Sequence, residues 1–251
     1  MRLDEGILYN LVPDLDVLGK TVAMCLHPMN VQSVCRINVG CGSSPTSGWL
    51  NFDGSPGVRL ANRPLLTKLL DSLRLLRDEN KRFIAFCRGS DIHWANGAHN
   101  LPVPTGSVNV LYSSHMLEHL DKREATDFLT EARRVLKHEG IIRLAVPDLR
   151  RIISDYETDG DADRLVSRTQ LAHIRPRTLL QKLRWLFAAD RSHHRWMYDA
   201  NSLMLFLTEA GFSHVVVQPA GATMIPNPGD LNLREREDES LYVEAQRLVI
   251  D

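Results

Sequence analysis

The sequence predicts an α/β fold built on a mostly parallel sheet, and three observations support this. Short apolar strands alternate with amphipathic helices along most of the chain. A glycine pair, in "NVGCG", directly follows the first of these strands, at the edge where open α/β sheets bind ligands. The length of 251 residues suits one sizeable α/β domain, so we expect residues 1–251 to form a single domain.

The first part of the chain carries the weakest pattern. Residues 1–34 show no clear period and are interpreted as an N-terminal extension that packs on the domain. Strands are predicted at 37–39 and 49–52, with only six residues between Gly42 and Trp49. Because a full helix does not fit into so short a connection, these two strands are expected to be joined by a loop alone.

A helical insertion interrupts the alternation at residues 57–82. Pro64 suits the first turn of a helix there. The leucines that recur at helical spacing lie at positions 65, 66, 69, 70, 73 and 76. The next two apolar pieces, 83–87 and 91–95, could each form a strand, and we favour the second as the core strand.

The second half of the chain alternates more regularly. A strand at 108–114 leads to an amphipathic helix at 122–140, for which Gly140 is a natural C-cap. A strand at 141–147 and a helical lid or substrate region at 150–198 follow. The last predicted elements are a helix at 201–212 and strands at 214–219 and 240–248. Because only a polar loop joins those last two strands, they are candidates for an antiparallel closing pair.

Composition and charge narrow the possible functions. A net charge of -1 argues against a generic nucleic-acid binder, which would carry a clear basic excess. The cysteines, at 25, 35, 41 and 87, form no C-x-x-C pair and no zinc-finger spacing, so we expect reduced thiols, a cytoplasmic protein and no metal site. The first residues do not resemble a signal peptide, and no stretch approaches the roughly 20 apolar residues of a membrane span.

The sequence around the glycine pair favours some cofactors over others. A dinucleotide fingerprint G-x-G-x-x-G needs a third glycine and a helix that takes the pyrophosphate, but here the run is "GCGSSP", with Pro45 in place of that glycine. A nicotinamide cofactor therefore fits poorly, whereas S-adenosylmethionine has a ribose and no phosphate. Asp53 ends the second strand and is the candidate for the ribose hydroxyls. A purely structural turn remains the alternative at this point.

Four segments, in order, carry a family resemblance: "RINVGCG", "LPVPTGSVNVLYSSHMLEHL", "LTEARRVLKHEGIIRLAVPDL" and "HHRWMYDANSLMLFLTEAGF". Together they resemble the class I S-adenosylmethionine-dependent methyltransferases. More narrowly, the chain looks like the bacterial methyltransferase-11-like group often linked to polysaccharide biosynthesis. The resemblance covers about residues 36–250. It implies a Rossmann-like sheet of seven strands, helices on both faces and a helical lid insertion.

The resemblance also implies which residues bind the cofactor. The glycine loop would cradle the methionine and ribose part, the acid after the second strand would bind the ribose, and the "WANGA" turn would face the adenine. The residues so implied are Asn38, Gly40, Cys41, Gly42, Asp53, Asn96, Gly97, Ser113, Ser114 and His115. Asn38 and Asn96 stand where the family commonly has acids, which predicts weaker cofactor binding.

Transfer of a methyl group to a hydroxyl benefits from a general base, and histidine suits that role near neutral pH. The predicted catalytic residues are His115, His193, His194 and Asp148. Asp148 could instead cap the helix that follows it. Glu118 and His119 are interpreted as residues at the start of a helix.

The acceptor is less well specified than the cofactor. The segment 164–195 holds eight basic residues and a single acid, which indicates either a solvated helix face, an anionic acceptor or a peripheral membrane contact near a lipid-linked glycan. The "HHRWMYD" run mixes aromatic and hydrogen-bonding side chains, as sugar sites do. We therefore expect O-methylation of a sugar or glycan-related acceptor, with no nucleic-acid partner. The alternatives are another small molecule or lipid as acceptor, or a catalytically weak cofactor-binding protein of the same fold.

Overall fold

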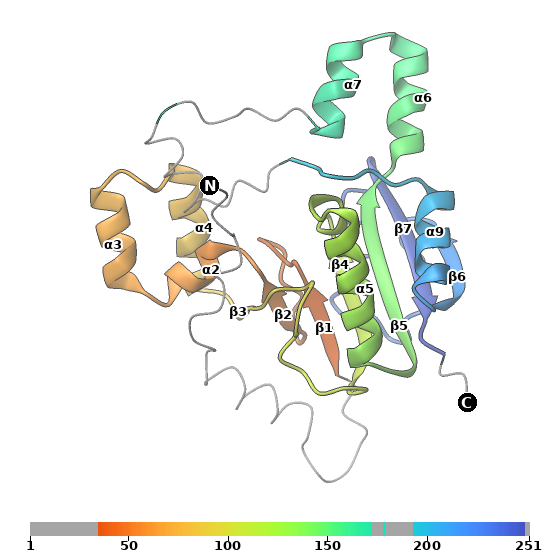
Figure 1. Cartoon of the computed structure of the whole chain (residues 1–251), viewed down its shortest axis with the longest axis horizontal. Helices are drawn as coiled ribbons and strands as arrows, with labels where there is room; N and C mark the ends of the chain where they lie inside the picture. Colours follow the sequence, from red (N-terminus) through yellow and green to blue (C-terminus); the bar gives the residue numbers. More distant parts are fainter. Residues whose placement is uncertain (1–34, 172–177, 179–192, 249–251) are drawn as a thin grey trace.

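The computed structural model describes residues 35–171, 178 and 193–248 (Figure 1). Its seven strands form one sheet in the order β3-β2-β1-β4-β5-β7-β6. The strands are β1 (Arg36–Val39), β2 (Leu50–Asp53), β3 (Ile92–Trp94), β4 (Val108–Ser114), β5 (Leu136–Pro147), β6 (Ser213–Gln218) and β7 (Ser240–Gln246). The helices are α2 (Pro56–Ala61), α3 (Pro64–Ser72), α4 (Asp78–Arg88), η2 (Leu117–His119), α5 (Lys122–Val135), α6 (Leu149–Asp159), α7 (Ala162–Thr169) and α9 (Ala200–Glu209).

The sheet is parallel except at one strand. Strands β1 to β5 pair in parallel, whereas β7 runs antiparallel to both β5 and β6. The expected Rossmann-like α/β fold and the antiparallel closing pair are both confirmed. The loop that joins β1 directly to β2, without a helix, is confirmed as well.

The strand order reverses between β1 and β4. From β1 the chain moves outward through β2 to β3, and then returns to place β4 on the other side of β1. Ligands of open α/β sheets bind outside the carboxyl ends of the strands at such a reversal. The residues that follow β1, β2 and β4 are therefore the ones to examine for a site.

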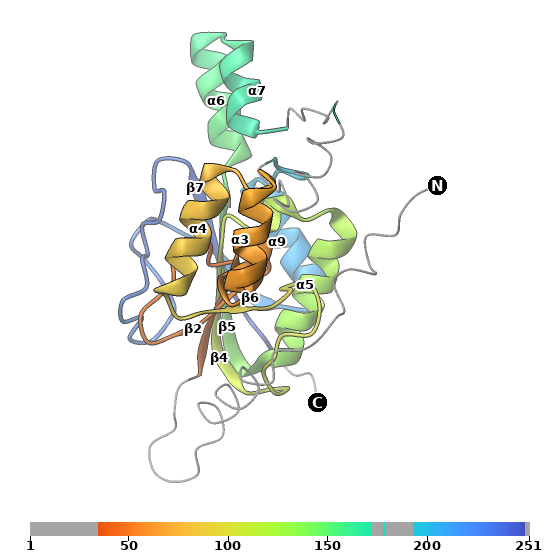
Figure 2. The same cartoon turned by 90° about the vertical axis from the view of Figure 1, so that its left-hand side faces the viewer.

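Helices α5 and α9 lie on the same face of the sheet (Figures 1 and 2). Phe128 and Leu129 of α5, and Leu203 and Leu207 of α9, are fully buried in the main core. Each such side chain contributes about 1.5–3 kcal/mol of hydrophobic stabilisation. On the opposite face, the loop between β6 and β7 packs Ile225 and neighbouring apolar residues against β4 and β5.

The predicted helix at 122–140 is too long. It begins with a capping box between Asp121 and Glu124, but it ends at Val135. Leu136 already belongs to β5, where it pairs with Val108 and is fully buried. The strand pairing thus outweighs the helical pattern in this stretch, and the assignment of Gly140 as a C-cap is wrong, because Gly140 lies inside β5.

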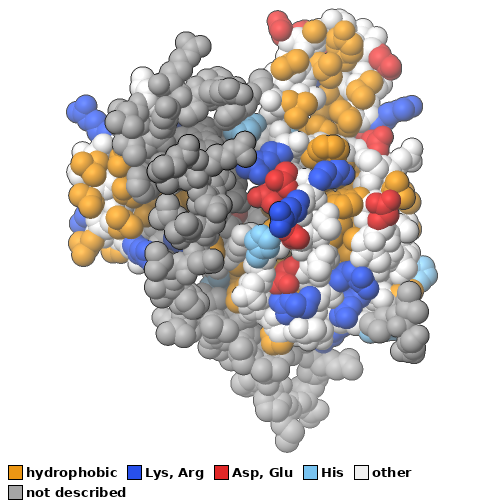
Figure 3. Space-filling model, in the orientation of Figure 1, with side chains coloured by type: hydrophobic (Ala, Val, Ile, Leu, Met, Phe, Trp, Pro, Cys, Tyr) orange, Lys and Arg blue, Asp and Glu red, His pale blue; other side chains and the backbone are white. Residues whose placement is uncertain are grey.

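The insertion near residues 57–82 forms the three helices α2, α3 and α4 at the β3 end of the sheet (Figure 1). The apolar piece 83–87 lies within α4, and the core strand is Ile92–Trp94, as favoured. The leucine stripe does not form one core-facing side. Leu70 is buried, whereas Leu65, which is 82% exposed, belongs to an apolar surface on α3 (Figure 3).

The described part of the region predicted as a lid contains two helices, α6 and α7, whereas residues 193–198 are not helical. Helices α6 and α7 form a hairpin that extends beyond the carboxyl ends of the strands (Figures 1 and 2). Of the eight basic residues predicted there, five lie outside the described residues. The other three form ion pairs with acids: Arg164 with Asp159, Arg168 with Asp155, and Arg195 with Glu124. Among the described residues, no helix has the length and apolar character to cross a membrane.

Candidate active site

The carboxylate of Asp53 joins the two loops that follow β1 and β2. Its Oδ2 accepts a hydrogen bond from the backbone N–H of Gly42 at 2.9 Å, and its Oδ1 accepts one from Ser55 at 2.8 Å. A carboxylate has about four acceptor positions, so each oxygen keeps one for a further donor. The Asp53 carboxylate can therefore accept a hydrogen bond from each of the two ribose hydroxyls, which is the role predicted for it.

Gly40 and Gly42 both have backbone conformations that favour glycine, with φ of 74° and 51°. A Cβ on Gly40 would lie 2.4 Å from Cγ of Met116, which follows β4. A Cβ on Gly42 would meet nothing within 4 Å. Gly40 therefore allows the loop after β1 to pack closely against Met116, whereas Gly42, whose N–H binds Asp53, borders open space.

Alanine substitutions should separate these two roles. Both place a side chain at positive φ, at a cost of about 1–2 kcal/mol. Gly40→Ala should lose roughly a further 1–3 kcal/mol through overpacking against Met116. Gly42→Ala should lose only the stability that the positive φ costs. It should also bind S-adenosylmethionine more weakly, because the added methyl group would occupy the space predicted for the cofactor. Urea unfolding and calorimetry measure the two effects, and equal unfolding free energies for the variants would contradict this assignment.

Two asparagines predicted near the cofactor hold the backbone of their own loops. Asn38 is buried, and its amide nitrogen donates to the carbonyl of Ser44 at 3.1 Å and the hydroxyl of Thr46 at 3.2 Å. The side-chain oxygen of Asn96 accepts from the backbone N–H of Ala98 at 3.2 Å. These contacts shape the cofactor loops, and direct contact of either asparagine with the cofactor stays a prediction.

The remaining loop residues predicted at the cofactor are also packed. Gly97 lies against Val39. Burial, followed by the charge of Asp53, raises the pKa of the Cys41 thiol, and the same causes raise the pKa of Cys87 to about 11. Both thiols therefore stay protonated at neutral pH. The three described cysteines are free and buried, as expected for reduced thiols, and Cys25 lies outside the described residues.

The end of β4 leads into a buried polar cluster. Ser113 is buried and Ser114 partly buried, and His115 follows with a φ of 48°. The His115 ring is hydrogen-bonded through Nε2 to Oγ of Ser240 at 2.8 Å, and its Nδ1 lies 3.2 Å from Oε1 of Glu118. Both ring nitrogens thus face protein atoms, so an acceptor would have to displace one of these contacts. The assignment of His115 as general base stays a prediction.

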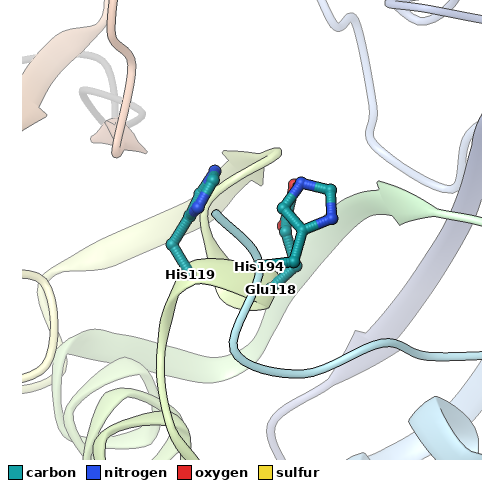
Figure 4. A group of neighbouring side chains, drawn as sticks. All are labelled: Glu118, His119 and His194. Atoms are coloured by element: carbon teal, nitrogen blue, oxygen red, sulfur yellow. The ribbon is translucent and has the colours of Figure 1, made fainter. Parts of the chain in front are cut away.

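Glu118 lies at the centre of this cluster. Its side chain is 1% exposed, and within the described residues neither carboxylate oxygen has a hydrogen-bond partner. Nε2 of His194 lies 4.0 Å from Oε1 of Glu118. The rings of His119 and His194 meet edge to face, with centroids 5.0 Å apart. Figure 4 shows these three side chains gathered at η2, with His194 contributed by a segment far along the sequence.

Backbone contacts bring that distant segment to the cluster. The carbonyl oxygen of Glu118 accepts hydrogen bonds from the N–H groups of Arg195 at 2.7 Å and Trp196 at 3.1 Å. His193 contributes its own carbonyl, which accepts from Nδ1 of His119 at 3.1 Å. The structure therefore unites the predicted residues His115 and His194 with Glu118 and His119. The last two were assigned only to a helix start, although the spacing H-x-x-E-H from 115 to 119 was a signal for them.

Electrostatics in the cluster follow from burial. Burial lowers the pKa of His194, the charge of Glu118 opposes this, and His119 and His115 lower it further. Burial also raises the pKa of Tyr198, with the charge of Glu118 as the second cause. His194 is therefore favoured in its neutral form, in which one ring nitrogen carries a lone pair.

Asp148 lies at the start of α6 and acts as its N-cap. Its Oδ1 accepts hydrogen bonds from the N–H groups of Arg150 at 3.0 Å and Arg151 at 3.5 Å. This is the capping alternative raised for it from the sequence. A catalytic role for Asp148 stays a prediction.

Comparison with known proteins agrees with this geometry. Residues 37–144, from β1 into β5, match the family model described as a methyltransferase domain. The chain is an S-adenosylmethionine-dependent methyltransferase. Its cofactor is S-adenosylmethionine, which Asp53 and the open space at Gly42 fit. No curated protein matches this methyltransferase.

Several solved structures are similar to the methyltransferase at low identity. One, from Thermotoga maritima, is described as a possible histamine N-methyltransferase, with 17% identity over 93% of this chain and 88% of that one, and a TM-score of 0.45. An S-adenosylmethionine-dependent methyltransferase from Archaeoglobus fulgidus has 13% identity over 97% and 95%, with a TM-score of 0.45. One from Mesorhizobium loti has 16% identity over 85% and 91%, with a TM-score of 0.44.

Proposed function

We propose that this methyltransferase O-methylates a sugar or glycan-related acceptor. The observation that carries the proposal is the cluster of Glu118 with His115, His119 and His194, which directly follows the residues of β4 that are predicted to face the cofactor. A hydroxyl needs groups that accept its hydrogen bond and then its proton, and imidazole and carboxylate groups do both.

The protein contributes to this reaction by positioning the acceptor and not by covalent catalysis. Bound S-adenosylmethionine supplies a methyl group on a sulfonium, which is already a good leaving group. With that cofactor bound, the methyl group would pass from its sulfur to the acceptor oxygen, leaving the demethylated cofactor, and the cluster would take the hydroxyl proton. The chain's contribution is to hold the hydroxyl in reach of the methyl carbon and to exclude water.

An aromatic side chain beside the cluster supports a sugar acceptor. Trp196 is 42% exposed, and its backbone is anchored on Glu118. Tyr198, two residues further on, is fully buried in the core. Nζ of Lys122 lies 4.6 Å from the centroid of the Trp196 ring and covers one of its faces, so within the described part of the "HHRWMYD" run a sugar ring could pack on the other face of Trp196. An anionic or lipid-linked acceptor would depend on basic residues outside the described part of the chain.

Product analysis tests the proposal directly. The enzyme, methyl-labelled S-adenosylmethionine and panels of free, nucleotide-linked and lipid-linked sugars should yield a label in a base-stable methyl ether. His194→Gln should lower turnover by about 10²–10⁴-fold, the range typical of a lost acid–base group, with cofactor affinity unchanged. His138→Ala, at an exposed histidine near the amino end of β5, is the matched control. Label found only on nitrogen, sulfur or carbon acceptors would refute O-methylation.

A further inference from the structure

Glu118 poses a problem that the methyltransferase reaction alone does not solve. A buried carboxylate normally accepts several hydrogen bonds, because losing its hydration costs several kcal/mol. Within the described residues, neither oxygen of Glu118 has a hydrogen-bond partner, although the side chain is 1% exposed. Two histidine nitrogens of the described residues lie within 4.0 Å of its Oε1, Nδ1 of His115 at 3.2 Å and Nε2 of His194 at 4.0 Å, and neither makes a hydrogen bond to it. The site therefore has acceptor capacity that the protein leaves unused.

The neighbouring His119 is held in the tautomer that a metal ligand needs. Its Nδ1 lies 3.1 Å from the carbonyl oxygen of His193, and a carbonyl can only accept, so Nδ1 carries the hydrogen. In the neutral ring the lone pair is then on Nε2. Metal-binding histidines typically use their second nitrogen in this way, donating to a backbone carbonyl that fixes the ring.

His194 provides a third ligand atom close to those of Glu118 and His119. Glu118, His119 and His194 each offer one ligand atom, and these three atoms lie within 4.8 Å of one another. Ligands of a tetrahedral zinc ion at about 2.0–2.1 Å lie about 3.4 Å apart, so the side chains would need to close by up to about 1.4 Å. We propose that Glu118, His119 and His194 form a binding site for one divalent transition-metal ion (Figure 4).

The donor set indicates the class of ion. Two imidazoles and one carboxylate suit zinc, manganese or iron better than calcium or magnesium, which prefer oxygen ligands. Three protein ligands leave at least one coordination position open, as catalytic sites do. With the ion bound, His194 would act as a ligand and not as the base, and a hydroxyl of the acceptor could take the open position and be polarised by the ion; this role rests on the proposed function. The binding site itself does not rest on it.

Cobalt(II) is a suitable probe, because its visible absorption reports coordination directly and needs no turnover. Chain without a histidine tag should first be freed of metal with a chelator. Titration should then give one bound Co²⁺ per chain, displaced by Zn²⁺. Glu118→Gln and His119→Ala should each weaken Co²⁺ binding by more than the about 10–100-fold that is typical of losing an outer partner. His138→Ala should bind as the unsubstituted chain does.

Two safeguards keep this test decisive. Glu118→Gln preserves side-chain shape, and circular dichroism checks that each variant is folded. His119 is only partly buried, so His119→Ala provides a second probe if the Glu118 variant does not fold. The proposal would be overturned if the folded, unsubstituted chain failed to bind Co²⁺ and Zn²⁺, or if the Glu118 and His119 variants bound Co²⁺ as tightly as the unsubstituted chain does. Metal binding without methylation of any hydroxyl would instead count against the proposed function alone.

Discussion

Asp53→Ala is expected to weaken binding of S-adenosylmethionine by about 100-fold or more. Two ribose hydroxyls would lose their charged acceptor, and a hydrogen bond to a charged group contributes about 1.5–3 kcal/mol. The change also removes the acceptor of the Gly42 and Ser55 N–H groups, so the loop that borders the cofactor space is no longer held. Both effects act in the same direction on affinity.

Calorimetry with S-adenosylmethionine and its demethylated product measures this effect. Asp53→Asn keeps the size of the side chain but loses its charge and one acceptor oxygen, so its affinity should fall between those of the alanine variant and the unsubstituted chain. Asp91→Ala is the matched control, because Asp91 is an exposed aspartate just before β3. Affinity of Asp53→Ala within a few-fold of the unsubstituted chain would show that the ribose is held elsewhere.

The second large effect concerns stability. Arg143 of β5 and Glu244 of β7 form an ion pair at 2.6 Å with both side chains fully buried. Arg143 also donates to the carbonyls of Ala222 and Leu233, and Glu244 accepts from Thr223, Gln218 and the N–H of Met224. The pair therefore fastens the loop between β6 and β7 to the sheet face. Removing one partner leaves the other charge buried and uncompensated, which typically costs about 3–5 kcal/mol.

Urea unfolding of Arg143→Met and Glu244→Gln should show this loss. The double variant Arg143→Met with Glu244→Leu should be more stable than the less stable single variant, because it leaves no unpaired charge. Arg234→Met, which breaks the exposed pair with Glu237, is the control and should cost less than about 1 kcal/mol. A loss below 1 kcal/mol in Arg143→Met would mean that the loop is held by apolar packing alone.

The fold was predictable from the sequence where the signal is local. The alternation of strands and helices predicted the sheet, and the short connection from Gly42 to Trp49 predicted the direct passage from β1 to β2. Errors arose where a distant partner decides the local structure. Leu136 continues a helical pattern but pairs with Val108, and much of the leucine stripe on α3 faces away from the core.

The candidate site residues also fall into those that the sequence predicted and those that it did not. Asp53 was predictable because the carboxyl ends of neighbouring parallel strands meet at one edge, whatever the detailed packing. His115 and His194 were also predicted, but as candidate bases rather than as partners of one carboxylate. Glu118 was assigned to a helix start, since its burial depends on Arg195 and Trp196, far along the chain, which hydrogen-bond to its backbone.

By itself, the sequence determined the α/β class, because the alternation of strands and helices is local, and its family resemblance indicated the S-adenosylmethionine cofactor. Asp53 as the acid that binds the ribose stays a prediction. Only the tertiary structure decided which polar side chains become buried together. The pair of Arg143 with Glu244, and the cluster of Glu118 with His119 and His194, each join residues that are far apart in sequence. Burial is a property of the packed molecule, and the charges of these groups acquire their chemical meaning only once water is removed around them.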